Sequence, residues 1–593
     1  MGRKASGQDK VDRITRRRSN GDTYVYERVT RYDSTKGYYV TVSSTLVGKL
    51  KPGSTDKYDL DQTRPKKRPS EVKAAKAETQ IEATRKHVGM INIVKRISEI
   101  AGIEKELEKA LPNDEGLAKK IATLAWYAFS TDGQSWPGAE NWTQRYRKEI
   151  PYSWTLMTGD IYHDVFVSVS QNESIRQSVF AGRIEGMGNQ CKLIALDSTT
   201  IVVNTKNPEK RGKCRKCKHK DSTFQIMVKI IFFYCIDTRI PIAFSVIPSS
   251  IPDSQTVEYA LAHINGLGTN KDIEIVFDNG YCTDGNICRC LLESRHFITR
   301  LEADTVWVAR EIEKIRSNLE HGGGEIVDCD YKMSGVKVPV HRKFSLRGQG
   351  KGDEQRSAEA DVNLFILFST ANKAKDEVYL RQTYSMYKND LLKGVALGKD
   401  RDTIIAFAKK FMLVEYDKTG RVRSVSLNRE AWEKALKYAG YLVLLADEED
   451  DLNTALIKFR KREYIEEMIK NFEMHVGGDK TRVWDDDTLD GEVMVWFEAL
   501  SMHEAFETKV NYLKSTLGIP TGDRDHDKIV ELDTERELSH WLQKTSLQNI
   551  LGHFDAVEYV YLKNKDKNRE VDWKTSQSKR DLLFLEKLEL LDV

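Results

Sequence analysis

The sequence has no long hydrophobic run and almost no net charge. No apolar stretch approaches the 18 or so residues of a membrane-spanning helix, and the best is the short run around Tyr441–Ala446. Hydrophobic residues make up 40% of the chain and charged residues 31%, which are the proportions of an ordinary folded protein. Because 93 Lys and Arg stand against 90 Asp and Glu, any nucleic-acid binding must depend on local basic clusters. We therefore expect no membrane association.

Cysteine is missing from most of the chain. All eight cysteines lie between Cys191 and Cys329, whereas a disulfide-stapled secreted protein would be shorter and would spread them. The first ten residues have no apolar core of the kind that secretory signals carry. We expect a protein of a reducing, cytoplasmic compartment. The sequence also has no Walker A motif and no G-x-S-x-G elbow, so neither ATP binding nor a serine hydrolase is predicted.

The middle of the chain has the pattern of a mixed α/β sheet. Three apolar strands, a helix, a strand, a helix and a final strand follow one another, at Lys192–Val203, Phe224–Ile236, Ile240–Ile247, Asp253–Gly266, Ile273–Asp278, Thr283–Glu293 and His296–Thr299. A turn at Asp237-Thr238 joins the second and third strands, and helices join the later ones, which predicts antiparallel and parallel pairs in one sheet.

Two acidic residues lie on these strands. Asp197 lies within an apolar strand, where a carboxylate is costly unless it is paired or binds a cation. Asp278 ends the strand Ile273–Asp278, at the end of a sheet where ligand sites form. If the two strands are neighbours, both carboxylates stay ionised only with a cation between them. Oxygen ligands of this kind suit Mg²⁺ or Mn²⁺ rather than zinc.

A third carboxylate is expected on a later helix, Asp451–Met474. Arg462 and Glu466 are four residues apart and share one face, with Lys470 one turn further on. Glu466 lies at the margin of the apolar stripe, where it can point toward the sheet. Asp197, Asp278 and Glu466 together predict a site for two-metal phosphoryl transfer. The plainer alternatives are turn chemistry at Asp278 and a surface salt bridge between Arg462 and Glu466.

Five segments in the right order resemble a DDE-class insertion-sequence transposase. They are LDSTT, Phe224–Val246, DNGYCTDGN, HFITRLEAD and FRKREYIEEMIKNFE followed by DKTRVWDDDTLDGEVMVWFEAL. The last resembles the family's Y-x₂-R-x₃-E-x₆-K element. YVYERVTRYD and LVGKL near the N-terminus also resemble the opening strands of such proteins, so that the likeness covers about residues 20–515.

The resemblance implies an RNase H-like core with Asp197, Asp278 and Glu466 as catalytic, metal-binding triad and two Mg²⁺ or Mn²⁺ ions. It also implies cleavage at transposon ends, strand transfer into target DNA, and a homodimer on double-stranded DNA in a prokaryotic nucleoid. Two positions depart from the pattern, since Phe459 replaces the family's Tyr and Glu473 its Lys. An RNase H-like nuclease without strand transfer and a non-catalytic DNA-binding protein remain the alternatives.

The residue patterns along the chain, together with this resemblance, predict an organisation in six segments. They are a basic arm, small β-meander and basic linker (1–70), a helical region for DNA binding or dimerisation (71–185), the first part of the core (186–300), a β-rich insertion (301–440), the second part of the core with the glutamate helix (441–515) and a mixed tail (516–593).

Three further features bear on DNA and metal binding. A basic loop, Lys206–Lys220, follows the strand of Asp197 and is expected to contact DNA phosphates, or to be a solvated hairpin. Its predicted DNA-binding residues are Lys213, Arg215, Lys216 and Lys218, which add to Arg462 and Lys470. Cys214 and Cys217 have the spacing of half a zinc site, but no second pair is evident, so zinc is not expected. Trp307 is either a base-stacking residue or part of the core.

Overall fold

The computed structural model describes most of the chain. The described residues are 9–18, 21–33, 37–63, 81–203, 212–218, 224–266, 272–328, 333–346, 356–394, 401–448, 450–483, 486–519, 529–564 and 569–590. They form two compact units, Met1–Thr84 with Val560–Trp573, and Arg85–Tyr559 with Lys574–Val593. The predicted basic linker lies outside the described residues.

The first unit contains an antiparallel four-stranded sheet in the order β1-β2-β3-β4. Its strands are β1 (Lys10–Arg17), β2 (Thr23–Asp33), β3 (Tyr38–Leu50) and β4 (Leu60–Thr63). The meander is therefore present, and β1 takes up part of the expected basic arm. Arg28 and Asp12 face each other on β2 and β1 and form a two-pronged ion pair at 3.0 and 2.6 Å.

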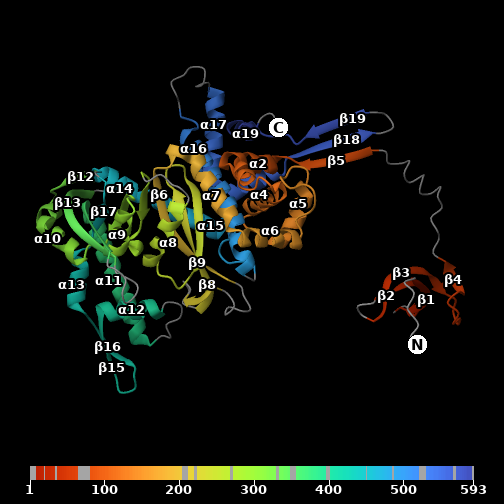
Figure 1. The fold of residues 1–593 in the computed structure, drawn as a ribbon, viewed down its shortest axis with the longest axis horizontal. Helices are drawn as coiled ribbons and strands as arrows, with labels where there is room; N and C mark the ends of the chain where they lie inside the picture. The colour runs from red at the N-terminus through yellow and green to blue at the C-terminus, as the bar shows by residue number, and fades with distance from the viewer. Residues whose placement is uncertain are drawn as a thin grey trace. The chain divides into compact units, whose positions relative to one another are not determined.

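A mixed sheet forms the centre of the second unit (Figure 1). Its described strands follow the order β12-β13-β14-β17-β11-β10-β6-β8-β7, and β9 pairs with β8. The bounds are β6 (Leu193–Val202), β7 (Arg215–Lys218), β8 (Phe224–Cys235), β9 (Ile240–Pro248), β10 (Glu274–Phe277), β11 (Phe297–Leu301), β12 (Glu325–Asp328), β13 (Met333–Leu346), β14 (Arg356–Phe368) and β17 (Tyr441–Ala446).

Five of these strands have the arrangement of an RNase H-like core. In the order β9-β8-β6-β10-β11, strands β6, β10 and β11 are parallel, while β8 is antiparallel to both of its neighbours. A short turn joins β8 to β9, and the helices α8 (Asp253–Gly266) and α9 (Asp284–Leu292) lie in the connections that lead to the parallel strands β10 and β11. The mixed α/β fold predicted from the sequence is confirmed.

The segment between β11 and β17 enlarges the sheet. Strands β12, β13 and β14 continue it beyond β17, while β15 (Met412–Tyr416) and β16 (Val422–Leu427) form a separate hairpin. The segment also carries helices α10 (Val306–Glu320), α11 (Thr370–Lys393), α12 (Arg401–Phe411) and α13 (Arg429–Lys437). The expected insertion is therefore partly helical, and its longest strands belong to the core sheet.

Helices cover both faces of the sheet around β6. Alternate residues of a strand point to opposite faces, and Thr199 of β6 bonds α15 (Glu463–His475) whereas Ser198 bonds Asp253 of α8. Asp197 shares the face of Thr199, so it points toward the helix that carries Glu466. The alternation of side chains along β6 thus decides which face of the sheet can hold a site that includes both Asp197 and Glu466.

The helical region before β6 packs against one long helix, α16 (Asp486–Thr516). Its helices are α2 (Gly89–Ala101), α3 (Ile103–Ala110), α4 (Glu115–Ser130), α5 (Ala139–Tyr146), α6 (Gly159–Gln171) and α7 (Glu173–Met187). Fully buried Arg183 of α7 ties these layers together, because its guanidinium contacts Glu106 and Glu498 at 2.7 Å each.

The helix predicted over Asp451–Met474 is two helices, α14 (Leu452–Arg460) and α15. The buried residues explain the break. The apolar stripe of α14 ends at Phe459, and that of α15 starts at Ile465, six residues later. At about 100° per residue, one continuous helix would turn these stripes to different sides. The break near Lys461 lets both stripes pack on the sheet.

The rest of the chain adds helices and a small sheet. Helices α17 (Ile529–Lys544), α18 (Leu547–Asp555) and α19 (Lys579–Lys587) follow α16, and β5 (Ile81–His87), β18 (Glu558–Asn564) and β19 (Arg569–Lys574) pair in the order β19-β18-β5. Among the described residues, no helix combines the length and apolarity needed to cross a membrane.

Candidate catalytic site

The sheet register places the first two predicted acids side by side. Leu196 of β6 pairs with Phe277 of β10 in a parallel ladder. Asp197 and Asp278 follow these two residues, so they occupy equivalent positions on adjacent strands. β10 ends at Phe277, and Asp278 opens a short 3₁₀ turn at Asn279–Tyr281. This is the end of a sheet at which α/β proteins place ligands.

Arg462 brings the third acid to the other two. One guanidinium nitrogen of Arg462 lies 2.7 Å from Glu466 Oε1 and 3.7 Å from Asp278 Oδ2, and the other lies 4.0 Å from Asp197 Oδ2. The Arg462 side chain is only 11% exposed, while Glu466 is 42% exposed. One partly desolvated guanidinium therefore faces three carboxylates from three separate elements, β6, β10 and α15.

A chain of polar contacts fixes Asp197 in place. The Ser198 backbone N–H donates to Asp197 Oδ1 at 2.8 Å, and the Tyr281 hydroxyl lies 3.2 Å from the same oxygen. Burial raises the pKa of Asp197 above its ordinary value, while the Ser198 N–H, Arg462 and Tyr281 act in the opposite direction. Burial also raises the pKa of Tyr281, which keeps its hydroxyl protonated as a donor.

The opposite face of β6 contains a supporting network that sequence reasoning missed. The Tyr281 hydroxyl also lies 2.9 Å from Ser198 Oγ, which donates to Asp253 of α8 at 3.1 Å. Asp253 is held in turn by Lys229 of β8 at 2.6 Å. The available signal was Lys229 itself, since a buried lysine in the apolar strand Phe224–Cys235 is expected to have an acidic partner.

The carboxylates suit a hard divalent cation. Asp278 Oδ1 is buried and has no hydrogen-bond partner among the described residues, which is costly for a carboxylate oxygen unless a ligand satisfies it. The first coordination sphere that Asp197, Asp278 and Glu466 can offer is made of oxygen atoms, as Mg²⁺ and Mn²⁺ prefer. The residues present therefore fit the predicted metal, and Arg462 supplies the positive charge that faces them in this structure.

The two departures from the family pattern have different surroundings. Phe459 is buried and packs at the end of α14, with the Arg462 guanidinium 5.6 Å from its ring centroid. Glu473 Oε1 accepts a 2.6 Å hydrogen bond from Thr199, two residues after Asp197. Lys470, one of the predicted DNA-binding residues, is exposed on α15. Glu473 thus holds α15 to β6.

The described part of the basic loop separates its lysines and arginine into two groups. Lys213 is engaged with Asp490 of α16 at 2.8 Å, and Asp490 also lies 3.5 Å from Arg176. Arg215 and Lys216 are exposed on β7, which ends at Lys218. Lys206, Lys210, Arg211 and Lys220 lie outside the described residues. Cys214 is buried, and Cys217 Sγ lies 3.2 Å from Ser249 Oγ.

Trp307 lies at the start of α10 and is partly buried against the core. The Arg342 guanidinium lies 4.5 Å from its ring centroid, in cation–π geometry. One face of the indole is therefore already covered by a side chain of β13.

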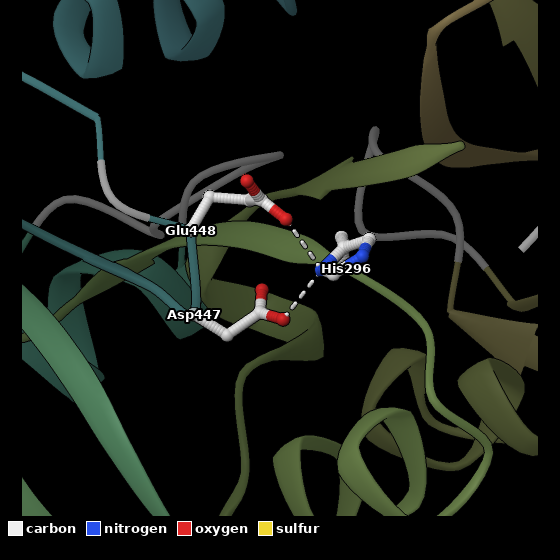
Figure 2. A group of neighbouring side chains, drawn as sticks. All are labelled: His296, Asp447 and Glu448. Atoms are coloured by element: carbon white, nitrogen blue, oxygen red, sulfur yellow. Dashed lines mark hydrogen bonds and ion pairs between the residues drawn. The ribbon is translucent and has the colours of Figure 1, made fainter. Parts of the chain in front are cut away.

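A second polar group lies at the opposite end of the sheet from Asp197 and Asp278 (Figure 2). His296 precedes β11, and Asp447 and Glu448 follow β17. His296 Nδ1 lies 2.8 Å from Asp447 Oδ2 and 2.7 Å from Glu448 Oε1, and the Phe297 N–H donates to Asp447 Oδ1 at 2.8 Å. Burial lowers the pKa of His296, but the Asp447 hydrogen bond and the neighbouring carboxylates outweigh it and raise the pKa overall.

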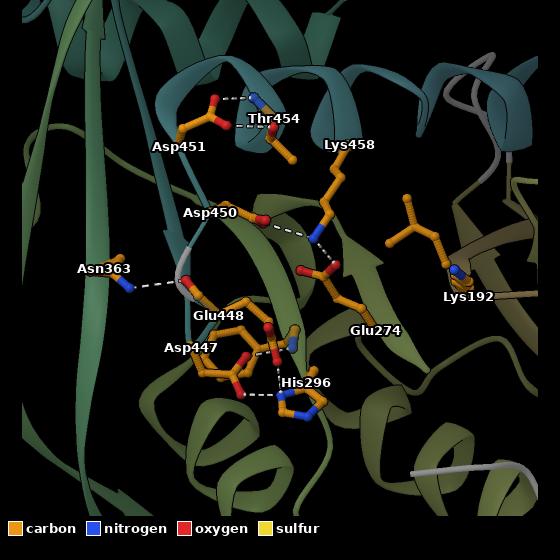
Figure 3. A network of polar contacts seen from close by, with 12 residues as sticks. Lys192, Glu274, His296, Asn363, Asp447, Glu448, Asp450, Asp451, Thr454 and Lys458 are labelled. Carbon is orange, nitrogen blue, oxygen red and sulfur yellow. Dashed lines mark hydrogen bonds and ion pairs between the residues drawn. The ribbon is translucent and has the colours of Figure 1, made fainter. Parts of the chain in front are cut away.

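Lys458 of α14 extends this polar group toward β10 (Figure 3). Its ammonium contacts Glu274 at 2.7 Å and Asp450 at 2.8 Å. Asn363 of β14 donates to the Glu448 carbonyl at 2.9 Å. The carboxylates at this end of the sheet are therefore matched by a lysine and a histidine, which favours a structural role.

The described strands thus form a sheet with the strand order of an RNase H-like core, and three carboxylates converge at one end of it. No family model matches the sequence, and no curated protein matches it. Among solved structures, a cryo-EM structure of the piggyBac transposase synaptic complex with hairpin DNA aligns with 79% of this chain and 85% of that chain, at 9% identity and a TM-score of 0.34. The fold assignment rests on the strand order and directions rather than on this weak likeness.

Proposed function

We propose that this protein is a DNA transposase that cleaves transposon ends and joins them to target DNA. The observation that carries the proposal is the convergence of Asp197, Asp278 and Glu466 on one guanidinium, at the ligand-binding end of an RNase H-like sheet. The proposed partners are double-stranded DNA, as terminal inverted repeats and as target, and a second copy of the chain.

The three carboxylates would hold two Mg²⁺ or Mn²⁺ ions. Two-metal chemistry supplies an activated attacking oxygen and a stabilised leaving oxygen. Asp197 is oriented for this task by the Ser198 N–H and Tyr281, and Glu466 by Arg462 four residues earlier on the chain. Because the buried Oδ1 of Asp278 has no described partner, it offers a ligand atom that costs no existing hydrogen bond.

DNA would be held by basic residues around this site. Arg215, Lys216 and Lys218 of β7 follow the catalytic strand in the chain, and Lys470 lies one turn after Glu466 on α15. Phosphate neutralisation by such residues gives sequence-independent affinity. Before cations and a scissile phosphate bind, the positive charge of Arg462 would balance part of the negative charge of the carboxylates.

The proposal is tested with purified full-length protein and DNA duplexes taken from the sequences that flank its coding region. We expect cleavage that leaves 3′-OH ends and joined products in Mg²⁺ or Mn²⁺, and neither product with a chelator. Asp197→Asn and Asp278→Asn should each lower cleavage by at least about 100-fold, since even outer-sphere partners of metal sites contribute 10- to 100-fold. DNA binding should be retained in both variants.

Glu467→Gln is the matched control, because Glu467 is exposed on the same helix and is absent from the Arg462 contacts. It should cleave like the unmodified protein. Metal-dependent cleavage that persists in Asp278→Asn would contradict the site. Cleavage without joined products would instead indicate a nuclease, and binding without cleavage a non-catalytic DNA-binding protein.

A further inference from the structure

A second cluster of possible metal ligands lies between α15 and α16. Single ligand atoms of His503, Glu504 and Glu507 all lie within 4.8 Å of one another. His503 and Glu504 are buried, with 7% and 4% of their surface exposed, and Glu507 is half-buried. One turn of α16 therefore presents one imidazole and two carboxylates to the same small volume.

The imidazole of His503 has a nitrogen without a partner. His503 Nδ1 is buried and makes no hydrogen bond with any described residue, and its nearest carboxylate oxygen, Glu504 Oε1, is 3.8 Å away. The ring stacks on His475 of α15, with centroids 5.2 Å apart and planes at 9°. A buried ring nitrogen left unpaired costs free energy, and a bound ion is one of the ways to recover it.

The carboxylates of Glu504 and Glu507 accept hydrogen bonds from neutral groups and have no positively charged partner among the described residues. The Asn471 amide of α15 donates to Glu504 Oε1 at 3.0 Å and to Glu507 Oε2 at 2.9 Å, and the Tyr234 hydroxyl donates to Glu504 Oε2 at 3.0 Å. No lysine or arginine among the described residues forms an ion pair with either carboxylate. The neutral Asn471 amide thus bridges two carboxylates that are largely buried. A cation bound between these carboxylates would be stabilised by their negative charge.

The cluster can be reached from a cavity of about 210 Å³. Its lining includes His475, His503, Glu507 and Lys514, so the cavity adjoins both an imidazole and a carboxylate of the cluster. Lys514 lies 3.4 Å from Asn511 Oδ1. The cluster therefore adjoins an open space rather than close-packed side chains.

We propose that His503 Nδ1, Glu504 and Glu507 bind one Zn²⁺ ion, with the Asn471 amide turned so that its oxygen completes the site. Nitrogen and oxygen ligands in this number suit zinc, and structural zinc sites are closed and four-coordinate. The site uses no cysteine and none of the three catalytic carboxylates. Its effect would be to fasten α15, which carries Glu466, to α16.

The His296 group is a weaker candidate for the same chemistry. His296 Nδ1 already contacts both Asp447 and Glu448 within hydrogen-bond distance, so its ring nitrogen is satisfied without an ion (Figure 2). The two clusters differ in this respect, because Nδ1 of His503 has no hydrogen-bond partner among the described residues.

The test measures zinc bound per full-length chain after gel filtration, in buffer with excess Mg²⁺ to occupy the all-oxygen site. We expect one Zn²⁺ per chain and a higher Tm than in protein stripped with a chelator. His503→Gln and Glu507→Gln should each weaken zinc binding by about 100-fold. Because Glu507 is half-buried, Glu507→Gln keeps the test valid if His503→Gln fails to fold.

Three controls fix the location of the ion. His475→Gln changes the stacked ring, whose Nδ1 pairs with Asp132 at 2.8 Å, and should keep the zinc. Cys217→Ser and Asp278→Asn should also keep it. Absence of bound zinc in the unmodified protein, full binding in Glu507→Gln, or loss of zinc in Cys217→Ser would each overturn the proposal. Because the readout is bound metal rather than DNA cleavage, the result is independent of the proposed function.

Discussion

At the scale of single residues, Arg462 explains how three acids tolerate one another. Asp197 is largely buried, and like charges at such distances would raise each other's pKa. The guanidinium lies within 4.0 Å of all three carboxylates and so replaces part of the charge that cations would bring. A metal ion bound at the proposed site would therefore compete with an internal ion-pair network.

Replacing Arg462 by Met should make the protein depend on divalent cations for stability. Without the guanidinium, the carboxylates lose a partner that is only 11% exposed, and the Tm in chelator should fall. Added Mg²⁺ should then raise the Tm of Arg462→Met more than that of the unmodified protein. Calorimetry with and without Mg²⁺ measures this. Equal Mg²⁺-induced shifts in both proteins would show that the guanidinium and the cation do not compete.

At the scale of secondary-structure elements, the orientation of α15 decides which glutamate reaches the site. Glu466 contacts Arg462, Glu467 is exposed, and Glu473 bonds Thr199. Glu466→Gln should therefore lower cleavage by at least about 100-fold, while Glu467→Gln and Glu473→Gln should keep most of it. Cleavage assays on matched amounts of folded protein provide the comparison. An inactive Glu467→Gln beside an active Glu466→Gln would mean that the helix register is wrong.

The basic residues on β7 and just before it are of two kinds. Arg215 and Lys216 are exposed, whereas Lys213 is held by Asp490 of α16. Lys216→Ala should flatten the log–log salt dependence of DNA binding by about one unit per lost phosphate contact. Lys213→Ala should change that slope less and lower the Tm instead. The reverse pattern would show that Asp490 releases Lys213 when DNA binds.

Sequence reasoning placed the core elements well but not the glutamate helix. Alternating apolar runs marked β6, β8, β9 and β10, and the crossover helix α8 made Asp197 and Asp278 neighbours. The break near Lys461 has no proline or glycine to signal it. It depends on how the Phe459 and Ile465 stripes meet the sheet, which is a tertiary effect. The Tyr281–Ser198–Asp253–Lys229 network was also missed, because its members are far apart in the chain and Lys229 alone does not identify its acidic partner.

At the scale of the whole molecule, the His296 group should link stability to pH. The raised pKa of His296 means that the folded state binds its proton more tightly than the unfolded state. Its stabilising contribution is complete below the unfolded pKa, about 6.5, and is lost as the pH rises through the folded value.

The Tm difference between the unmodified protein and His296→Gln should therefore shrink as the pH increases from about 6. Because the His296 side chain is 38% exposed, the effect should stay below about 1 kcal/mol. Differential scanning calorimetry across this range measures it. A difference that grows with pH would mean that the imidazole is neutral in the folded protein.

The pairing of β14 with β17 has a consequence for any attempt to shorten this protein. Residues Val362–Phe368 of β14 are buried and cover one side of Tyr441–Ala446 along their whole length. Excising Met333–Phe368 would leave a run of unpaired backbone groups beside aromatic and aliphatic side chains. Such a surface recruits identical strands from other molecules. A trimmed version should accumulate as insoluble aggregates, although none of its proposed catalytic residues would have been removed.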